Sequence, residues 1–131
     1  MNAETDRRRA EQPEDLGKLF ETRLNAGDLE GLLALYEPEA VLHFPPGNVA
    51  AGIDAIRAAY EQALAGKPSI RLEPRGALRA GDLALTTVRW TLDMTGPDGQ
   101  PATMTGSTAE VARRQADGTW LWVIDNPSLG G

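Results

Sequence analysis

Two acidic residues near the carboxyl end of the chain are the strongest candidates for proton-transfer chemistry. Glu110 and Asp125 both lie in segments with the patterning of strands. A carboxyl group that faces an apolar interior has a raised pKa and can act as an acid or a hydrogen-bond donor. We therefore predict that the two can form an acid and base pair. The structural alternatives are a salt bridge from Glu110 to an arginine such as Arg89, and a bond from Asp125 to nearby backbone.

His43 is the only histidine and the third catalytic candidate. Imidazole is the one side-chain group that titrates near neutral pH without help from its surroundings. Because Phe44 follows His43 directly, strand alternation places their side chains on opposite faces unless a bulge intervenes. A single histidine and no cysteine give no metal-ligand spacing, and no phosphate-binding glycine motif occurs. We therefore expect neither a metal nor another cofactor.

The first half of the chain carries the apolar spacing of amphipathic helices. Gly27 is suited to a left-handed helix cap, and Asp28 can cap the helix that follows. Residues 37–39 contain a proline and are expected to end that second helix. The predicted helices cover residues 14–26, 28–36 and 52–66, and a short strand at 40–44 is followed by a loop.

The second half of the chain predicts an antiparallel meander, with turn signals rich in glycine and aspartate between its strands. The four expected strands cover residues 70–79, 83–95, 102–115 and 119–126. Leu85 and Val88 would point to opposite faces of a regular strand. For both to face the core the strand needs an extra residue between them, which predicts a bulge at residues 86–87. Trp90 then either forms the floor of a pocket or fills the core. Helices followed by a meander indicate an α+β domain with segregated layers.

The last predicted strand carries bulky side chains on both of its faces. One face holds Leu121, Val123 and Asp125, and the other holds Trp120, Trp122 and Ile124. A single helix layer cannot cover both faces. We therefore expect a homodimer that forms through the outer sheet face of Trp120, Trp122 and Ile124.

Composition argues against several classes of partner. The formal net charge of −6 and the sequence pI of about 4.7 disfavour nucleic acid. No apolar stretch approaches the ~20 residues of a membrane helix, so no membrane partner is expected. The absence of cysteine fits the cytoplasm. Residues 1–13 read as a polar, disordered leader around the arginines at 7–9, and residues 14–131 as a single domain.

Short motifs run along most of the chain: residues 24–31 (LNAGDLEG), Leu35-Tyr36, Pro45, Gly47, Gly52, residues 55–57 with Tyr60, Arg113-Arg114 and residues 117–120 (DGTW). With them the chain resembles the nuclear transport factor 2-like, ketosteroid isomerase-like superfamily, which includes SnoaL-like proteins with a cystatin-like fold. Its ending looks like that of small bacterial members whose activity is mostly unassigned. The resemblance implies three N-terminal helices packed on a strongly curved, mostly antiparallel sheet, forming a cone with an internal pocket.

The same resemblance can be checked against the active groups of the isomerases. These use an aspartate base, a tyrosine donor and a protonated late-strand aspartate. The matching positions here are Phe44, Phe20 and Glu110, so two of the three groups lack the needed chemistry. Tyr36 and Tyr60 match tyrosines that support the donor. Because phenylalanine cannot accept a proton, we do not expect ordinary ketosteroid isomerisation.

Three functions remain open at this stage. The first is binding of a small, largely apolar or aromatic molecule, with isomerase-, dehydratase- or cyclase-type chemistry from Glu110, Asp125 or His43. Its pocket, of a few hundred Å³, would be lined by Phe20, Tyr36, Phe44, Tyr60, Trp90 and Val123. The second is a non-catalytic, dimeric binding or scaffold module. The third is epoxide hydrolase-like chemistry, which needs an Asp, Arg, Asp cluster to which Asp125 and Arg89 could contribute.

Overall fold

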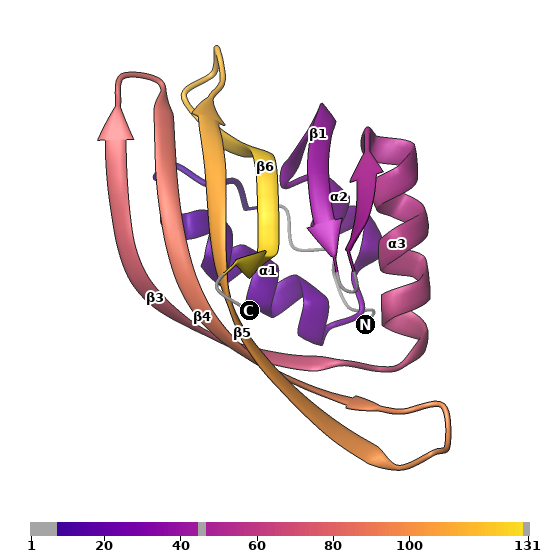
Figure 1. The fold of residues 1–131 in the computed structure, drawn as a ribbon. Coiled ribbons are helices and arrows are strands. Elements are labelled where there is room, and N and C mark those ends of the chain that lie inside the picture. Colours follow the sequence, from indigo (N-terminus) through magenta and orange to yellow (C-terminus); the bar gives the residue numbers. More distant parts are fainter. Residues whose placement is uncertain (1–7, 45–46, 130–131) are drawn as a thin grey trace.

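The computed structural model describes residues 8–44 and 47–129 and has the predicted α+β architecture. Figure 1 shows the long strands β3, β4 and β5 bending around α1. The helices are α1 (Asp15–Asn25), α2 (Leu29–Leu33) and α3 (Ile53–Ala65). The strands are β1 (Tyr36–Phe44), β2 (Asn48–Ala51), β3 (Ser69–Ala80), β4 (Leu83–Thr95), β5 (Pro101–Arg114) and β6 (Trp120–Leu129).

The strands form one curved sheet of six in the order β2-β1-β6-β5-β4-β3. Every neighbouring pair is antiparallel except β1 and β6, which run parallel. The sheet does not close, since β2 and β3 are its two edges. α1 packs against β3 and β6, and α3 packs against β1 and β2, so the helices line the hollow side of the sheet.

The sequence pattern predicted α1 and α3 correctly. Gly27 has a φ of 69°, the left-handed conformation expected of a helix cap. The Asp28 side chain accepts a hydrogen bond from the Gly31 N–H at 2.9 Å and caps α2 as predicted. α3 lies within one residue of the predicted bounds and buries Tyr60 on its inner side.

The segment between α2 and α3 differs from the prediction. Tyr36 does not belong to the second helix but begins β1, where it pairs with Trp122. Residues 37–39 are therefore part of a strand, and the prediction that they end a helix is wrong. Pro38 lacks an N–H and lies where the pairing of β1 with β6 is interrupted. The predicted loop also contains the short strand β2, which pairs with β1.

Strand β6 contains a bulge that reverses the predicted faces. Trp122 and Ile124 pair with adjacent residues of β5, so Val123 is the extra residue. Trp120, Trp122 and Asp125 consequently all face the interior and are 1 %, 4 % and 6 % exposed. Asp125 therefore does not share a face with Val123. The placement of the two tryptophans on an outer, dimer-forming face is also wrong, and only Ile124, at 48 %, is exposed there.

The predicted bulge at residues 86–87 is absent from β4. The irregularity lies in the neighbouring strand, because Pro74 and Gly76 of β3 pair with adjacent residues of β4 and Arg75 is extra. β4 alternates without a break, so Leu83 and Leu85 point outward and are 44 % and 41 % exposed. Large side chains on the outer face produced the false signal.

The segment that precedes α1 is packed, in contrast to the prediction of a disordered leader. Ala10 is 2 % exposed, and its carbonyl oxygen accepts a hydrogen bond from the Trp120 N–H at 2.9 Å. Arg23 of α1 donates to the carbonyl of Arg8. The prediction is therefore wrong for residues 8–13, while residues 1–7 lie outside the described residues. Within the described ranges, no helix has the length and apolar character needed to cross a membrane.

Candidate functional site

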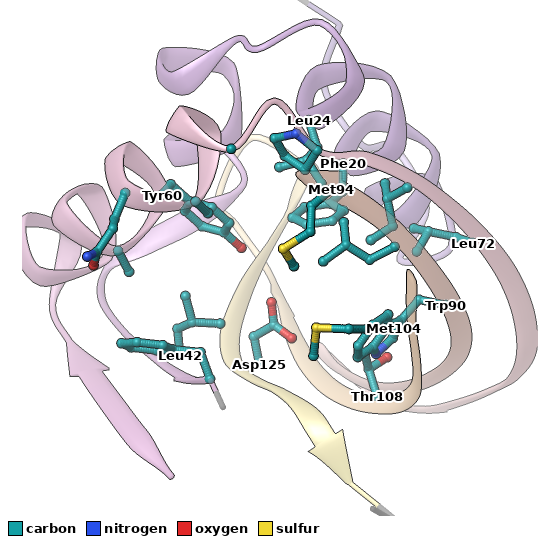
Figure 2. Close-up of a pocket in the computed structure, with 18 of the residues that line it drawn as sticks. Phe20, Leu24, Leu42, Tyr60, Leu72, Trp90, Met94, Met104, Thr108 and Asp125 are labelled. Atoms are coloured by element: carbon teal, nitrogen blue, oxygen red, sulfur yellow. The ribbon is translucent and has the colours of Figure 1, made fainter. Parts of the chain in front are cut away.

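A cavity of about 660 Å³ lies between α1, α3 and the hollow side of the sheet. Figure 2 shows side chains from both layers pointing into it. Among the residues expected to line a pocket, Phe20, Phe44, Tyr60 and Trp90 lie in its wall, whereas Tyr36 and Val123 do not. Further apolar parts of the wall come from Leu24, Leu42, Ile70, Leu72, Val88, Leu92, Met94, Met104 and Trp122.

Trp90 illustrates how the sheet shapes this wall. Its cross-strand partner in β5 is Gly106. A Cβ atom at position 106 would collide with the indole ring, so only glycine leaves room for the ring to lie across β5. Trp90 is 8 % exposed and belongs to the core cluster as well as to the wall.

Asp125 is a polar group of the cavity wall that belongs to a chain of hydrogen bonds. Figure 2 shows its carboxyl group pointing into the cavity. The hydroxyl of Tyr36 donates to Oδ2 of Asp125 at 2.6 Å. The hydroxyls of Tyr36 and Tyr60 are also 2.6 Å apart. A chain of hydrogen bonds thus links the carboxyl group to Tyr60, which lines the cavity from α3.

Glu110 lies directly opposite Asp125 on the neighbouring strand, so the register of β5 and β6 brings the predicted pair together. It is 4 % exposed and also lines the cavity. The hydroxyl of Thr86 donates to its Oε1 atom at 2.7 Å. The polar part of the site is therefore a buried pair of carboxyl groups, held by a tyrosine on one side and a threonine on the other.

Arg89 does not take part in this site. It is exposed on β4, whose even-numbered residues, such as Thr86, face the interior. The alternative in which Glu110 forms a salt bridge with Arg89 is therefore wrong. For the same reason Arg89 cannot complete the Asp, Arg, Asp cluster that epoxide hydrolase-like chemistry requires.

Burial and mutual repulsion set the proton affinity of the pair. Burial, and after it the charge of Glu110, raise the pKa of Asp125 to about 7, against a smaller opposing effect of the Tyr36 hydrogen bond. Burial also raises the pKa of Glu110, and the hydrogen bond from Thr86 partly offsets this increase. Two negative charges this close are unfavourable, so the pair can hold a proton near neutral pH. One carboxyl group can then donate a proton while the other accepts one.

The two tyrosines stay protonated beside this pair. Burial, and after it the charge of Asp125, raise the pKa of Tyr36 and of Tyr60 well above 10. Because Tyr36 gives its only proton to Asp125, the hydrogen bond between the tyrosines must come from Tyr60. When Asp125 itself carries a proton, the chain can run the other way, and the Tyr60 hydroxyl then becomes a donor toward the cavity.

His43, the third catalytic candidate, lies away from the carboxyl pair. It faces the opposite side of β1 from the wall residue Phe44, as alternation indicated, and pairs with Val49 of β2. Its Nδ1 atom is buried without a hydrogen-bond partner in the described part of the chain. Among residues 8–44 and 47–129, no three histidine or acidic side chains are grouped as metal ligands.

Thr86 and Thr108 were missed as parts of the site. A signal for Thr86 was present, because the tight turn at residues 96–99 sets the register of β4 on β5. That register places Thr86 opposite Glu110. Thr108 lies two residues before Glu110 and so shares its face. Both hydroxyls could have been found by counting back from the turn.

Comparison with known proteins gives one family and a common fold. A family model described as a SnoaL-like domain matches residues 17–123. No curated protein matches the chain. Among solved structures, a ketosteroid isomerase-like protein from Erwinia carotovora atroseptica is 19 % identical with a TM-score of 0.78, over 86 % of this chain and 89 % of that one.

Two other solved structures have the same fold and differently described functions. A putative dehydratase of the nuclear transport factor 2-like family from Streptomyces avermitilis is 20 % identical with a TM-score of 0.77, over 92 % of this chain and 97 % of that one. A putative calcium/calmodulin-dependent protein kinase II association domain from Xanthomonas campestris is 22 % identical with a TM-score of 0.72, over 90 % and 86 %. At these identities the likeness concerns the fold alone.

Proposed function

Because the chain belongs to the SnoaL-like domain family, and because its cavity contains a buried carboxyl pair, we propose that it binds a small, largely apolar organic molecule and carries out acid–base chemistry on it. The reaction is of the isomerase, dehydratase or cyclase type. The observation that carries this proposal is the opposed pair of Asp125 and Glu110 in a cavity with an otherwise apolar wall.

Asp125 is the proposed base. In its ionised form it removes a proton from a carbon of the bound molecule. Once Asp125 carries that proton, the hydrogen-bond chain reverses, and the Tyr60 hydroxyl can donate to the negative charge on a neighbouring oxygen, as can a protonated Glu110. In an isomerisation the proton returns to a different carbon. In a dehydration it goes to a leaving hydroxyl group, which departs as water. Phe20 and Phe44 contribute apolar contacts only.

The proposal is tested by proton exchange on a simple ketone. We would add the protein to 2-tetralone in D₂O and follow the loss of its α-proton signals by NMR. We expect the wild-type protein to accelerate exchange and Asp125→Asn to lose about 100-fold of that acceleration. Asp54→Asn, on the exposed side of α3, is the matched control and should behave as wild type. Bound ketone with no accelerated exchange would contradict the acid–base role.

A second role, self-association, is supported by the outer face of the sheet. Leu78, Leu85, Val111 and Ile124 lie in register across four neighbouring strands. Leu78 is 72 % exposed, and Leu85 and Ile124 are 41 % and 48 % exposed. A contiguous apolar row of this kind favours burial against an identical surface. The relative from Xanthomonas campestris, described as an association domain, supports the same interpretation.

The proposed partner is therefore a second copy of this chain, packed on the row of Leu78, Leu85, Val111 and Ile124. Leu85→Glu places a charge in the middle of the row and should convert a dimer to a monomer in analytical ultracentrifugation. Ala55→Glu places the same charge on the exposed side of α3, away from the outer face of the sheet, and is the control. A wild-type protein that sediments as a monomer at all concentrations would contradict this proposal.

A further inference from the structure

The charges that face the cavity all have the same sign. Its wall contains two carboxyl groups, Asp125 and Glu110, and no lysine, arginine or histidine among the described residues that line it. The Tyr36 hydroxyl bonds Oδ2 of Asp125, which leaves Oδ1 of the same carboxyl group as a possible acceptor toward the cavity. The cavity therefore presents an acceptor oxygen with no cation to balance it.

The rings around Asp125 add a second preference for positive charge. Trp122 and Tyr60 line the cavity together with Asp125. Phe20 lies between the two rings, and the centroid of its ring is 5.7 Å from that of Trp122 and 6.1 Å from that of Tyr60. The faces of such rings attract a cation, more strongly where water is excluded. An aromatic wall beside an unbalanced carboxyl group is a suitable environment for an ammonium group.

We propose that the cavity takes a hydrophobic amine in its protonated form, with the ammonium group between Asp125 and Glu110 and the apolar part against the aromatic wall. This inference rests on the proposed function, namely that the cavity binds a small apolar molecule. The formal net charge of −6 on the chain adds a long-range attraction for cations. A carboxylate or phosphate ligand would meet like charges and no basic partner.

Binding of the ammonium group is coupled to proton release. The groups that face Asp125 are Glu110 from β5, Tyr36 from β1 and, through Tyr36, Tyr60 from α3. An ammonium group favours the ionised carboxylates, so a proton held by the pair leaves to solvent when the amine binds. Affinity for the amine should fall as the pH is lowered and the pair takes up protons.

Three matched probes test the proposal by isothermal titration calorimetry. They are 1-naphthylmethylamine, 1-naphthylmethanol and 1-naphthoate, which share one ring system and differ in charge. We expect the amine to bind at least about tenfold more tightly than the alcohol, and the carboxylate to bind most weakly. An alcohol that binds as tightly as the amine, or a carboxylate that binds best, overturns the inference but leaves the apolar site intact. Failure of all three probes overturns the proposed function as well.

Two further measurements locate the amine. Asp125→Asn should weaken the amine about tenfold or more and the alcohol less than about threefold, whereas the control Asp54→Asn should change neither. Equal losses for both probes would overturn the assignment of the ammonium group to Asp125. Wild-type titrations at pH 6.5 in two buffers of different ionisation heat should reveal about half a proton or more released per amine bound. Release of no proton would overturn the inference even if Asp125→Asn fails to fold.

Discussion

The two carboxyl groups of the cavity are cross-strand partners, yet they lie in different surroundings. Asp125 is bonded to Tyr36, and through it to Tyr60, on the side of the cavity formed by β1 and α3. Glu110 is bonded to Thr86 on the side formed by β4. Glu110 also borders a second, smaller cavity of about 260 Å³ between α1 and β3, whose wall includes Lys18 and Glu21.

This difference separates the roles of two otherwise similar groups. Asp125 lines only the main cavity of the two and is hydrogen-bonded to a chain of aromatic hydroxyls. Glu110 has the second cavity behind it, which gives it a route to polar surroundings. We therefore assign direct chemistry on the ligand to Asp125 and supply of charge and protons to Glu110.

The largest expected effect is on the exchange of 2-tetralone α-protons. Asp125→Asn should lose about 100-fold of the acceleration, because it removes the base. Glu110→Gln should lose about tenfold, because the base remains but its pKa falls once the neighbouring charge is gone. Equal losses in the two variants, measured by NMR under the same conditions, would remove the distinction between the two sides.

The next effect is on stability as a function of pH. The pKa of Asp125 is about 7 in the folded protein against an ordinary value of 3.8, so the folded state binds the proton more tightly than the unfolded state. The free energy of unfolding is therefore highest at low pH, where Asp125 is protonated. It falls as the pH rises from about 4 to about 7, by up to about 1.4 kcal/mol per pH unit.

Urea unfolding at pH 5 and pH 7.5 measures this loss. Asp125→Asn cannot ionise, so its free energy of unfolding should change less between the two pH values than that of the wild type. A difference between the two proteins that does not vary with pH would contradict a raised pKa at Asp125.

The hydrogen bonds on the two sides should also differ in strength. Tyr36→Phe removes a hydroxyl that takes part in two hydrogen bonds, with Asp125 and with Tyr60, and should lower the free energy of unfolding by about 1.5–3 kcal/mol at neutral pH. Thr86→Val keeps the shape but removes the donor to Glu110, with an expected loss of about 1 kcal/mol. Chemical denaturation of both variants checks the order, and a larger loss at Thr86 would reverse the comparison.

The smallest effect concerns the second cavity. Lys18 of α1 is exposed and is the one cationic side chain among the described residues that line it. Lys18→Met should therefore fold and should slightly raise the pKa of Glu110, because it removes a positive charge that favours the ionised carboxylate. The pKa of Asp125, followed by carboxyl NMR, should change less. A larger shift at Asp125 would show that the second cavity does not serve Glu110.

The parts of the fold that could be predicted are those with a local signal. The helix over α1, the cap at Asp28 and the bounds of β4 follow from apolar spacing, capping chemistry and turn residues in the chain itself. The pairing of β4 with β5 follows in the same way from the tight turn between them, and with it the position of Thr86 opposite Glu110.

The parts that could not be predicted depend on contacts between distant segments. The bulge at Val123 arises from how β6 pairs with β5, and it alone turns Asp125 toward the cavity with Trp120 and Trp122. Tyr36 fits the apolar face of a helix as well as it fits a strand, and only its pairing with Trp122 decides between them. Alternation within a single strand carries no information about a partner strand that shifts register.

A ¹³C NMR titration of the Asp125 carboxyl carbon shows whether the carboxyl pair of the cavity holds a proton near neutral pH. We expect a transition near pH 7 in the wild type that moves to lower pH in Glu110→Gln, because burial and the charge of Glu110 both raise the pKa of Asp125. A transition near the ordinary value of 3.8 that is unchanged in Glu110→Gln would contradict the claim.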